Sequence, residues 1–169
     1  MIIWLNGTFG AGKTTAAAEL TRQLPRSRVF DSETVGHMLR HVITEPVRNF
    51  QDWPPWRSLV VHAAAQLQRY LGETLIIPQT VLDQRYAREI FDGLTEHGVE
   101  FRHFLLHAED TELRRRITTG TTEAETLQWR LDHLHAYQAA LPWLSTSAVV
   151  IDTTTLPPKE IAYKIINQL

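Results

Sequence analysis

Short apolar runs alternate along this chain with longer segments whose apolar residues recur every three or four positions, as on one face of a helix. The short runs predict five strands, at residues 2–5, 27–30, 74–77, 101–107 and 148–151. The longer segments predict helices at about residues 15–24, 31–42, 58–71, 86–97, 109–117, 123–141 and 158–169, the sixth ending before Pro142. Continuous apolar strands that alternate with helices are typical of a parallel sheet covered on both faces. We therefore expect a three-layer α/β fold that forms one domain over residues 1–169.

A glycine-rich loop joins the first predicted strand to the first helix. Residues 7–14, Gly-Thr-Phe-Gly-Ala-Gly-Lys-Thr, fit the pattern G-x-x-x-x-G-K-[ST]. In such a loop the backbone N–H groups turn toward a phosphate, the lysine binds the outer phosphates, and the threonine hydroxyl ligates Mg²⁺. The sequence therefore predicts a nucleoside triphosphate site in a P-loop NTPase fold. The loop residues predicted to bind the nucleotide are Gly7, Phe9, Gly10, Ala11, Gly12, Lys13, Thr14 and Thr15.

Composition narrows the class of protein further. The 169 residues carry a net charge of −2, which argues against a nucleic-acid partner, because proteins that bind the phosphate backbone usually have a basic excess. The chain has no cysteine, so disulfides and thiolate metal sites are excluded. The first strand begins at residue 2, and no apolar run approaches the roughly 18 residues of a membrane span. We expect a cytoplasmic protein whose membrane association is at most peripheral.

In a parallel α/β sheet, ligands bind beyond the carboxyl ends of the strands. Asp31 directly follows the second strand, where its carboxylate would take a proton from an attacking hydroxyl or ligate Mg²⁺. The alternative is that Asp31 only caps the helix that follows. The third strand has no acidic residue at its end, and we expect Gln79 and Thr80 to face the pocket there as neutral hydrogen-bond partners. The expected metal ligands are therefore Thr14 and Asp31, with phosphate oxygens and water.

Arginines in the second half of the chain are candidates for binding the nucleotide. Arg114, Arg115 and Arg116 point in different directions on a helix, so they do not all serve one ligand. We assign Arg116 to the nucleotide base, because a planar guanidinium stacks well on an aromatic ring. The hydroxyl-rich stretch that follows predicts a flexible lid at about residues 118–130. Arg130 is its candidate catalytic arginine, which would swing over the γ-phosphate as charge develops, and an ordinary surface arginine is the alternative.

Two further patterns have a structural and a functional interpretation. The stretch Trp53-Pro-Pro-Trp56-Arg57 is stiff and apolar with one charge beside it. Its tryptophans either pack in the core or form a wall for a flat ring or an alkyl chain of a substrate, and both interpretations stay open. His37 and His41 lie four residues apart on a helix, but a zinc site is disfavoured because no third ligand is near them in the sequence.

Several motifs together resemble the tunicamycin-resistance protein family of ATP-binding P-loop proteins, which are related to small-molecule kinases such as chloramphenicol phosphotransferase and shikimate kinase. The resemblance rests on the glycine loop, on Asp31-x-Glu33-x-x-Gly36-x-x-Leu39-Arg40 and on Phe50-Gln-x-x-Pro54-x-Trp56-Arg57. It extends through Leu75-Ile-Ile-Pro78-x-Thr80, Leu113-x-x-Arg116 and Trp129. It thus covers nearly the whole chain, and the Phe50 motif is more specific than the loop.

The resemblance implies binding of ATP with Mg²⁺ and resistance to tunicamycin, a nucleoside antibiotic that carries uracil, sugars and a fatty acyl chain. By analogy with the related kinases, Asp31 would be the base, and Arg116 would stack on adenine opposite the loop that contains Asp152, Thr153 and Pro157. Together with the residue patterns described above, this gives Lys13, Asp31 and Arg130 as the expected catalytic residues. The substrate-binding residues expected are Asp31, Arg40, Gln51, Trp53, Trp56, Arg57, Gln79 and Thr80.

We therefore expect a phosphotransferase that moves the γ-phosphate of ATP to a hydroxyl of tunicamycin or a related nucleoside-like acceptor. One alternative is a protein that binds ATP and sequesters tunicamycin without chemistry, which the missing acidic residue after the third strand favours. The other is a kinase of an ordinary metabolite.

Overall fold

The computed structural model describes residues 1–121 and 123–169. Five strands form one sheet with the order β2-β3-β1-β4-β5, and all neighbours are parallel. The strands are β1 (Ile2–Asn6), β2 (Ser27–Val29), β3 (Thr74–Pro78), β4 (Phe101–His107) and β5 (Val149–Asp152). The helices are α1 (Lys13–Gln23), α2 (Glu33–Leu39), α3 (Pro54–Leu71), α4 (Gln84–Glu96), α5 (Asp110–Thr119), α6 (Ala124–Ser147) and α7 (Pro158–Ile166), and a short 3-10 helix is η1 (Phe50–Asp52). This confirms the predicted α/β fold.

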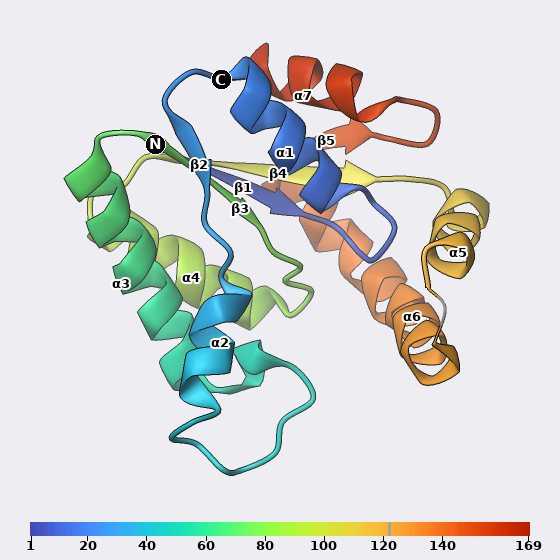
Figure 1. Ribbon diagram of the computed structural model, residues 1–169, viewed down its shortest axis with the longest axis horizontal. Coiled ribbons are helices and arrows are strands. Elements are labelled where there is room, and N and C mark those ends of the chain that lie inside the picture. The colour runs from blue at the N-terminus through green and yellow to red at the C-terminus, as the bar shows by residue number, and fades with distance from the viewer. Residues whose placement is uncertain (122) are drawn as a thin grey trace.

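Alternate residues of the central strand β1 face two separate layers of the core. Ile3 and Leu5 are fully buried in the cluster that contains α1 and α7, whereas Ile2 and Trp4 are fully buried in the cluster that contains α3 and α4. Figure 1 shows α1 and α7 on one face of the sheet and α3, α4 and α6 on the other. Because both faces of β1 are covered, the strand is a continuous apolar run. The parallel strands place all their carboxyl ends at one edge of the sheet, where the polar loops meet.

Two of the helix boundaries that differ from the sequence prediction involve proline. The prediction that the sixth helix ends before Pro142 is wrong, because α6 continues through this residue to Ser147. The buried side chain of Leu144 lies beyond the proline, and its burial favours continuing the helix despite the lost hydrogen bond. At the other boundary, α3 begins at Pro54 rather than at residue 58. Proline suits the first turn of a helix, where its missing N–H needs no partner.

The short helix α2 is fixed to the segment that follows it by one close contact. A Cβ atom added at Gly36 would lie 2.2 Å from Cγ and from Cδ2 of Phe50 in η1. The guanidinium of Arg40 lies 4.5 Å from the centre of the same ring. The contact explains why Gly36, Arg40 and Phe50 occur together in the motifs noted above: they form one packing unit, in which only glycine leaves room for the ring.

We expect Gly36→Ala to lower the free energy of unfolding by about 1–3 kcal/mol, because the added methyl group has to displace the Phe50 ring. In a Phe50→Ala background the same substitution should be neutral or should stabilise the protein by up to about 1 kcal/mol, since alanine is the better helix former. Chemical denaturation of the four proteins in this double-mutant cycle measures both effects. If Gly36→Ala has the same effect in both backgrounds, the two residues do not make this contact.

Candidate functional site

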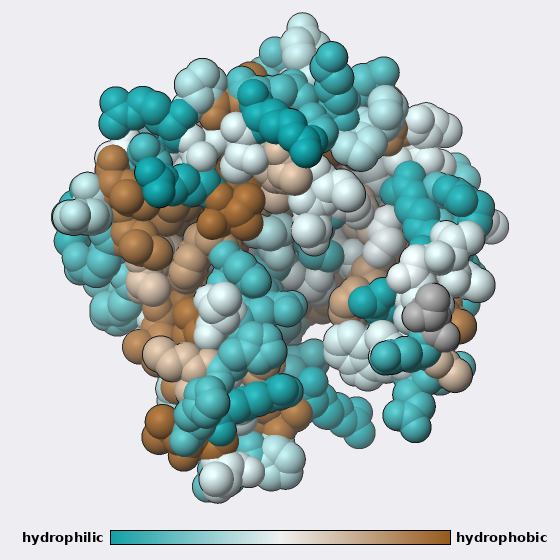
Figure 2. Space-filling view, in the orientation of Figure 1, coloured by the Kyte–Doolittle hydropathy of each residue, from teal (hydrophilic) through white to brown (hydrophobic). Residues whose placement is uncertain are grey.

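A cavity of about 940 Å³ opens at the carboxyl edge of the sheet. The glycine loop and the start of α1 form its floor, α2 and residues 48–52 line one side together with the exit of β3, and α5, α6 and the start of α7 line the other. Figure 2 shows a hollow between the lobe that contains α2 and the lobe that contains α6. The volume is at the upper end of the roughly 300–1,000 Å³ that is usual for small-molecule sites.

The glycine loop has the backbone shape that an anion site requires. Gly7 has a φ of 139°, and a Cβ atom there would lie 2.5 Å from the carbonyl oxygen of Leu106. Gly12, with a φ of 93°, precedes α1, and no described side chain caps the first turn of this helix. The N–H groups of that turn and the positive end of the helix dipole therefore favour an anion. The buried hydroxyl of Thr8 also has no partner among the described residues, which fits a site that a ligand completes.

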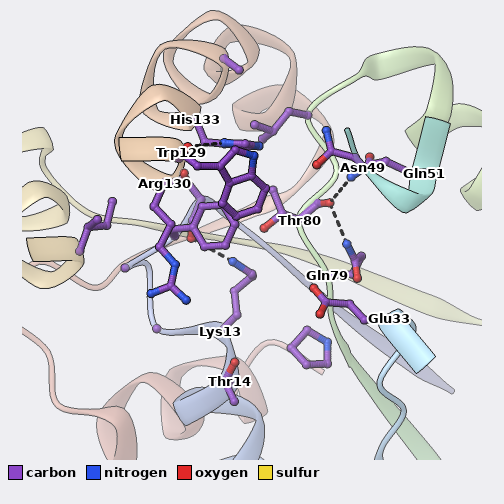
Figure 3. Close-up of a pocket in the computed structure, with 18 of the residues that line it drawn as sticks. Lys13, Thr14, Glu33, Asn49, Gln51, Gln79, Thr80, Trp129, Arg130 and His133 are labelled. Carbon is purple, nitrogen blue, oxygen red and sulfur yellow. Dashed lines mark hydrogen bonds between the residues drawn. The ribbon is translucent and has the colours of Figure 1, made fainter. Parts of the chain in front are cut away.

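Lys13 is held inside the loop. Its Nζ donates hydrogen bonds to the carbonyl oxygens of Gly7 and Thr8, at 2.9 Å each. Burial lowers the pKa of Lys13 to about 8, and the negative charge of Glu33 partly offsets this effect. Figure 3 shows Lys13 and Thr14 beside Glu33 in the cavity. A phosphate at this place would compete with the two carbonyl groups for the lysine.

Arg116 joins the glycine loop to the connection between β5 and α7. Its guanidinium donates to the carbonyl oxygen of Gly10 at 3.1 Å and to those of Thr153 and Thr154 at 2.6 and 3.1 Å. It also pairs with Glu112 at 2.7 Å. All these contacts use N–H groups in the guanidinium plane, so they leave its faces for the stacking that the sequence predicts.

Five of the residues predicted to bind the nucleotide support the cavity without lining it: Gly7, Ala11, Asp152, Thr153 and Pro157. The buried Thr153 hydroxyl lies 3.2 Å from the carbonyl oxygen of Ala11, and the Asp152 carboxylate accepts the N–H of Thr154 at 2.8 Å. From this part of the chain the cavity is lined instead by Leu156, Pro158 and Ile161. These three were not predicted, because single apolar residues in and around the first turn of a helix have no distinctive sequence pattern.

Of the two acidic residues at the start of α2, Glu33 lines the cavity and Asp31 does not; the other lining carboxylates, Asp52 and Asp83, accept the backbone N–H groups of Asn49 and Arg85. Asp31 Oδ1 accepts the backbone N–H of Glu33 at 3.0 Å, as a capping residue does, and Asp31 does not line the cavity. Glu33, in the first turn of α2, lines the cavity and acts electrostatically on Lys13. The structure therefore favours the capping alternative for Asp31. The signal for Glu33 was present in the sequence, since it belongs to the same motif.

Four other predicted substrate-binding residues do line the cavity: Arg40, Gln51, Gln79 and Thr80. The Gln51 side chain donates to the carbonyl oxygen of Thr80 at 3.0 Å, and the Gln79 amide oxygen accepts the Ser32 hydroxyl at 2.7 Å. These contacts make one connected polar wall, which Figure 3 shows together with Asn49. Asn49 was missed because a lone asparagine in a connecting segment has no sequence signature.

The tryptophan-rich stretch lies in the core and not in the cavity. Trp53 and Trp56 are 7% and 0% exposed, and Trp56 Nε1 donates to the carbonyl oxygen of Ser32 at 3.1 Å. Arg57 pairs with Glu89, and its guanidinium lies 4.1 Å from the centre of the Tyr86 ring. Of the two interpretations left open for this stretch, the structure supports core packing. The charge of Arg57 is already paired within the protein.

Helix α6 brings an aromatic group to the cavity. The ring of Phe9, in the glycine loop, lies 4.9 Å from Trp129 and 5.3 Å from His133, measured between ring centres. Both α6 residues line the cavity, as does Phe9. The glycine loop and α6 are therefore in direct contact through aromatic side chains.

Arg130 also lines the cavity, where the sequence prediction put it. It donates to the Thr121 hydroxyl at 2.8 Å, and its guanidinium lies 5.5 Å from the centre of the Phe9 ring. Its Nε is buried and has no partner among the described residues. Thr122 belongs to the lid predicted at residues 118–130 and lies outside the described residues; the motion of that lid stays a prediction.

Oxygen ligands for a metal ion are few at this site. Within the described residues, no group of three or more His, Cys, Asp or Glu side chains is arranged to hold a metal ion. The Thr14 hydroxyl and the Glu33 carboxylate are two oxygen groups that line the cavity near Lys13. This set fits Mg²⁺, which in phosphate-transfer sites takes most of its ligands from phosphate and water.

No helix in the described parts of the chain is long and apolar enough to cross a membrane.

Several solved structures share this fold. The chain is similar to the tunicamycin resistance protein of Deinococcus radiodurans, with a TM-score of 0.75 and 29% identity over 99% of this chain and 94% of that one. It is also similar to a sugar kinase from Janibacter sp. HTCC2649 (TM-score 0.69, 17% identity, 98% and 92% of the two chains). A third similar structure is the Mycobacterium tuberculosis APS kinase in complex with AMPPNP and APS (0.67, 14%, 98% and 95%). At the identities of the last two, the similarity shows the fold alone.

No curated protein matches the sequence. The first of the structural matches confirms the resemblance to tunicamycin-resistance proteins on which several of the site predictions rest. Residues 2–142, from β1 into α6, match the AAA domain family. Because that match spans most of the chain and includes the glycine loop, this protein belongs to the AAA domain family and has its P-loop kinase-like fold.

Proposed function

We propose that this protein is a phosphotransferase that moves the γ-phosphoryl group of ATP to a hydroxyl of a small nucleoside-like molecule such as tunicamycin. The observation that carries the proposal is that Lys13, Thr14 and Glu33 line one cavity. They supply a cation for phosphates, a hydroxyl for Mg²⁺ and a carboxylate for a proton. The similarity to a tunicamycin resistance protein supports the choice of acceptor.

The cavity has two ends, which suit two ligands. The loop, Arg116 and the apolar start of α7 form one end, which suits a nucleotide with its base beside the arginine. Glu33, Gln51 and Thr80 belong to the opposite wall, which offers hydrogen-bond partners to a polar acceptor. Lys13 lies between them, near Glu33. A phosphoryl group bound by Lys13 would therefore face the acceptor end.

In the proposed reaction the acceptor oxygen bonds to the γ-phosphorus while the bond from that phosphorus to the oxygen of ADP breaks. The proton of the acceptor hydroxyl passes to the Glu33 carboxylate, which later releases it to solvent. Lys13 and Arg130 stabilise the charge on the transferred group, and Thr14 would hold Mg²⁺, which would neutralise charge on the phosphates. Most of the rate enhancement in such a site comes from positioning and fixed charges.

A second candidate function is sequestration of the small molecule without chemistry. One observation favours it: β3 ends at Pro78 and is followed by the neutral side chains of Gln79 and Thr80. The residues that directly follow β3 therefore offer no carboxylate to a catalytic metal ion.

The two candidates differ in what happens to the mass of the drug. When the protein is incubated with Mg²⁺, ATP and tunicamycin, we expect mass spectrometry to detect tunicamycin that carries one added phosphate, together with an equal amount of ADP. Lys13→Ala serves as the control and should give no phosphorylated drug. If the drug binds tightly and keeps its mass, sequestration is correct and the phosphotransferase proposal is wrong.

The choice between Glu33 and Asp31 as the base is tested by a matched pair of substitutions. We expect Glu33→Gln to reduce kcat by at least about 100-fold with little change in ATP affinity, because it removes the carboxylate that takes the proton. Asp31→Asn should leave kcat within a few-fold, because the amide oxygen still accepts the Glu33 N–H at the start of α2. Steady-state kinetics and ATP titrations of both variants give these values. If Asp31→Asn lowers kcat much more than Glu33→Gln does, the base is Asp31 and not Glu33.

The affinity for ATP should fall as the pH rises above about 8. Free Lys13, with a pKa of about 8, loses its charge there, whereas bound phosphates favour the charged form. Binding above this pH must therefore take up a proton, at a cost of up to about tenfold in affinity per pH unit. Calorimetry in two buffers with different ionisation enthalpies measures the uptake. Lys13→Arg, which stays charged, should lose this dependence. An unchanged wild-type affinity from pH 7.5 to 9.5 would contradict the assignment.

A further inference from the structure

Trp129 is an exposed aromatic side chain inside the cavity, and the reaction proposed above assigns it no role. Its exposed fraction is 42%, although it projects from the lining of a concave site. Among the large apolar side chains described as exposed, it alone lines this cavity. An indole exposed in the wall of a pocket leaves apolar surface in contact with water, which a ligand can cover.

The indole is held by its neighbours and still keeps 42% of its surface exposed. Phe9 lies 4.9 Å away at an angle of 55° between the ring planes, and His133 lies 4.3 Å away at 62°. Neither ring is parallel to the indole, so no parallel stack on it is found among the described residues. His133 Nδ1 lies 2.7 Å from the carbonyl oxygen of Trp129, which fixes the relative position of these two residues. Trp129 is therefore a preorganised surface for a flat ring.

The groups across the cavity suit the edge of such a ring. Figure 3 shows Trp129 projecting from α6 into the cavity toward Thr80, with Asn49 and Gln51 beyond it. Gln51 uses one amide N–H on the Thr80 carbonyl group, at 3.0 Å, and both amide side chains line the cavity. A primary amide carries donors and an acceptor side by side, as the edge of a nucleobase does. The Trp129 ring and these two amides together match a planar ring with polar atoms at its edge.

We propose that Trp129 is the stacking platform for a planar heterocyclic ring of the acceptor, with the amides of Asn49 and Gln51 at the edge of that ring. The inference rests on the proposed function and narrows its acceptor to molecules that contain such a ring. Trp129 does not serve the base of ATP, because Arg116 and the start of α7 form a separate surface at the nucleotide end. Acceptors without a flat ring, such as simple sugars, lack the group that this platform binds.

The test measures binding, so that it does not depend on turnover. Calorimetric titrations with uridine, tunicamycin and glucose, each with saturating AMPPNP and Mg²⁺, are carried out on the wild-type protein and on variants. We expect Trp129→Leu to bind uridine and tunicamycin about 10-fold more weakly, the effect typical of one lost stacking contact, and Trp129→Phe to keep most of the affinity. Tyr70→Leu is the control, because Tyr70 is 88% exposed on α3 and lies outside the cavity. It should change nothing.

Two further readouts separate stacking from a structural effect through Phe9. The affinity for AMPPNP should stay the same in Trp129→Leu, and an equal loss of AMPPNP affinity would overturn the proposal. Binding of uridine should quench the indole fluorescence of the wild-type protein but not that of Trp129→Phe, because the other tryptophans lie outside the cavity.

Failure of this inference is distinguishable from failure of the proposed function. If Trp129→Leu weakens binding of uridine but no phosphate is transferred to any acceptor, the stacking role of Trp129 is supported and the phosphotransferase proposal is wrong. If uridine does not bind, or if glucose binds as tightly as uridine, the platform proposal is wrong, whatever the outcome of the phosphotransfer assay.

Discussion

The site depends on the fixed backbone of the glycine loop, which is held by side chains from outside it. Asn6, at the end of β1, accepts the N–H groups of Gly7 and Val81 at 2.8 and 3.0 Å and donates to the carbonyl oxygen of Val81 at 2.9 Å. The Thr80 hydroxyl donates to the carbonyl oxygen of Gly7 at 2.6 Å, and Arg116 holds that of Gly10. The loop is thus tied to the exit of β3 and to α5. Its N–H groups therefore need little reorganisation to receive an anion.

This arrangement also explains how the protein holds a lysine in a buried place before any phosphate arrives. Burial disfavours the charged form of Lys13, and two loop carbonyl groups with the nearby charge of Glu33 compensate for part of that cost. The side chains of Lys13 and Glu33 also have a role in the proposed reaction. In the proposed reaction a phosphate replaces the carbonyl groups as the partner of Lys13, and the carboxylate of Glu33 remains beside it for the acceptor. Glu33 therefore both stabilises the charge of Lys13 and is the group proposed to take the proton.

The fold and the loop could be predicted from the sequence because both follow from local patterns. The apolar run at Ile2–Leu5 and the loop that follows it need only their own residues to be recognised, and the Phe9 to Thr15 side of the site followed from them. The prediction about Pro142 was wrong because burial of Leu144 outweighs a local signal. Local pattern also cannot show where a side chain points.

Contacts between residues far apart in the sequence determine which side chains line the acceptor side of the cavity. Trp56 lies in the core because α3 starts at Pro54 and turns this residue toward the sheet, which no short motif reveals. Asp31 and Glu33 differ by two positions in one motif, and the cap at the start of α2 determines which of them reaches the cavity. Asn6, whose amide holds the loop, has no sequence signal at all, because its role exists only when β1 and β3 are adjacent.

The most direct test of this account is a crystal structure with AMPPNP and Mg²⁺ bound. The account predicts that Lys13 Nζ leaves the carbonyl oxygens of Gly7 and Thr8 and contacts phosphate oxygens, with the Glu33 carboxylate facing the γ-phosphate and the base beside Arg116. A structure in which AMPPNP binds elsewhere, or in which Lys13 stays on the loop carbonyl groups with the nucleotide present, would contradict it.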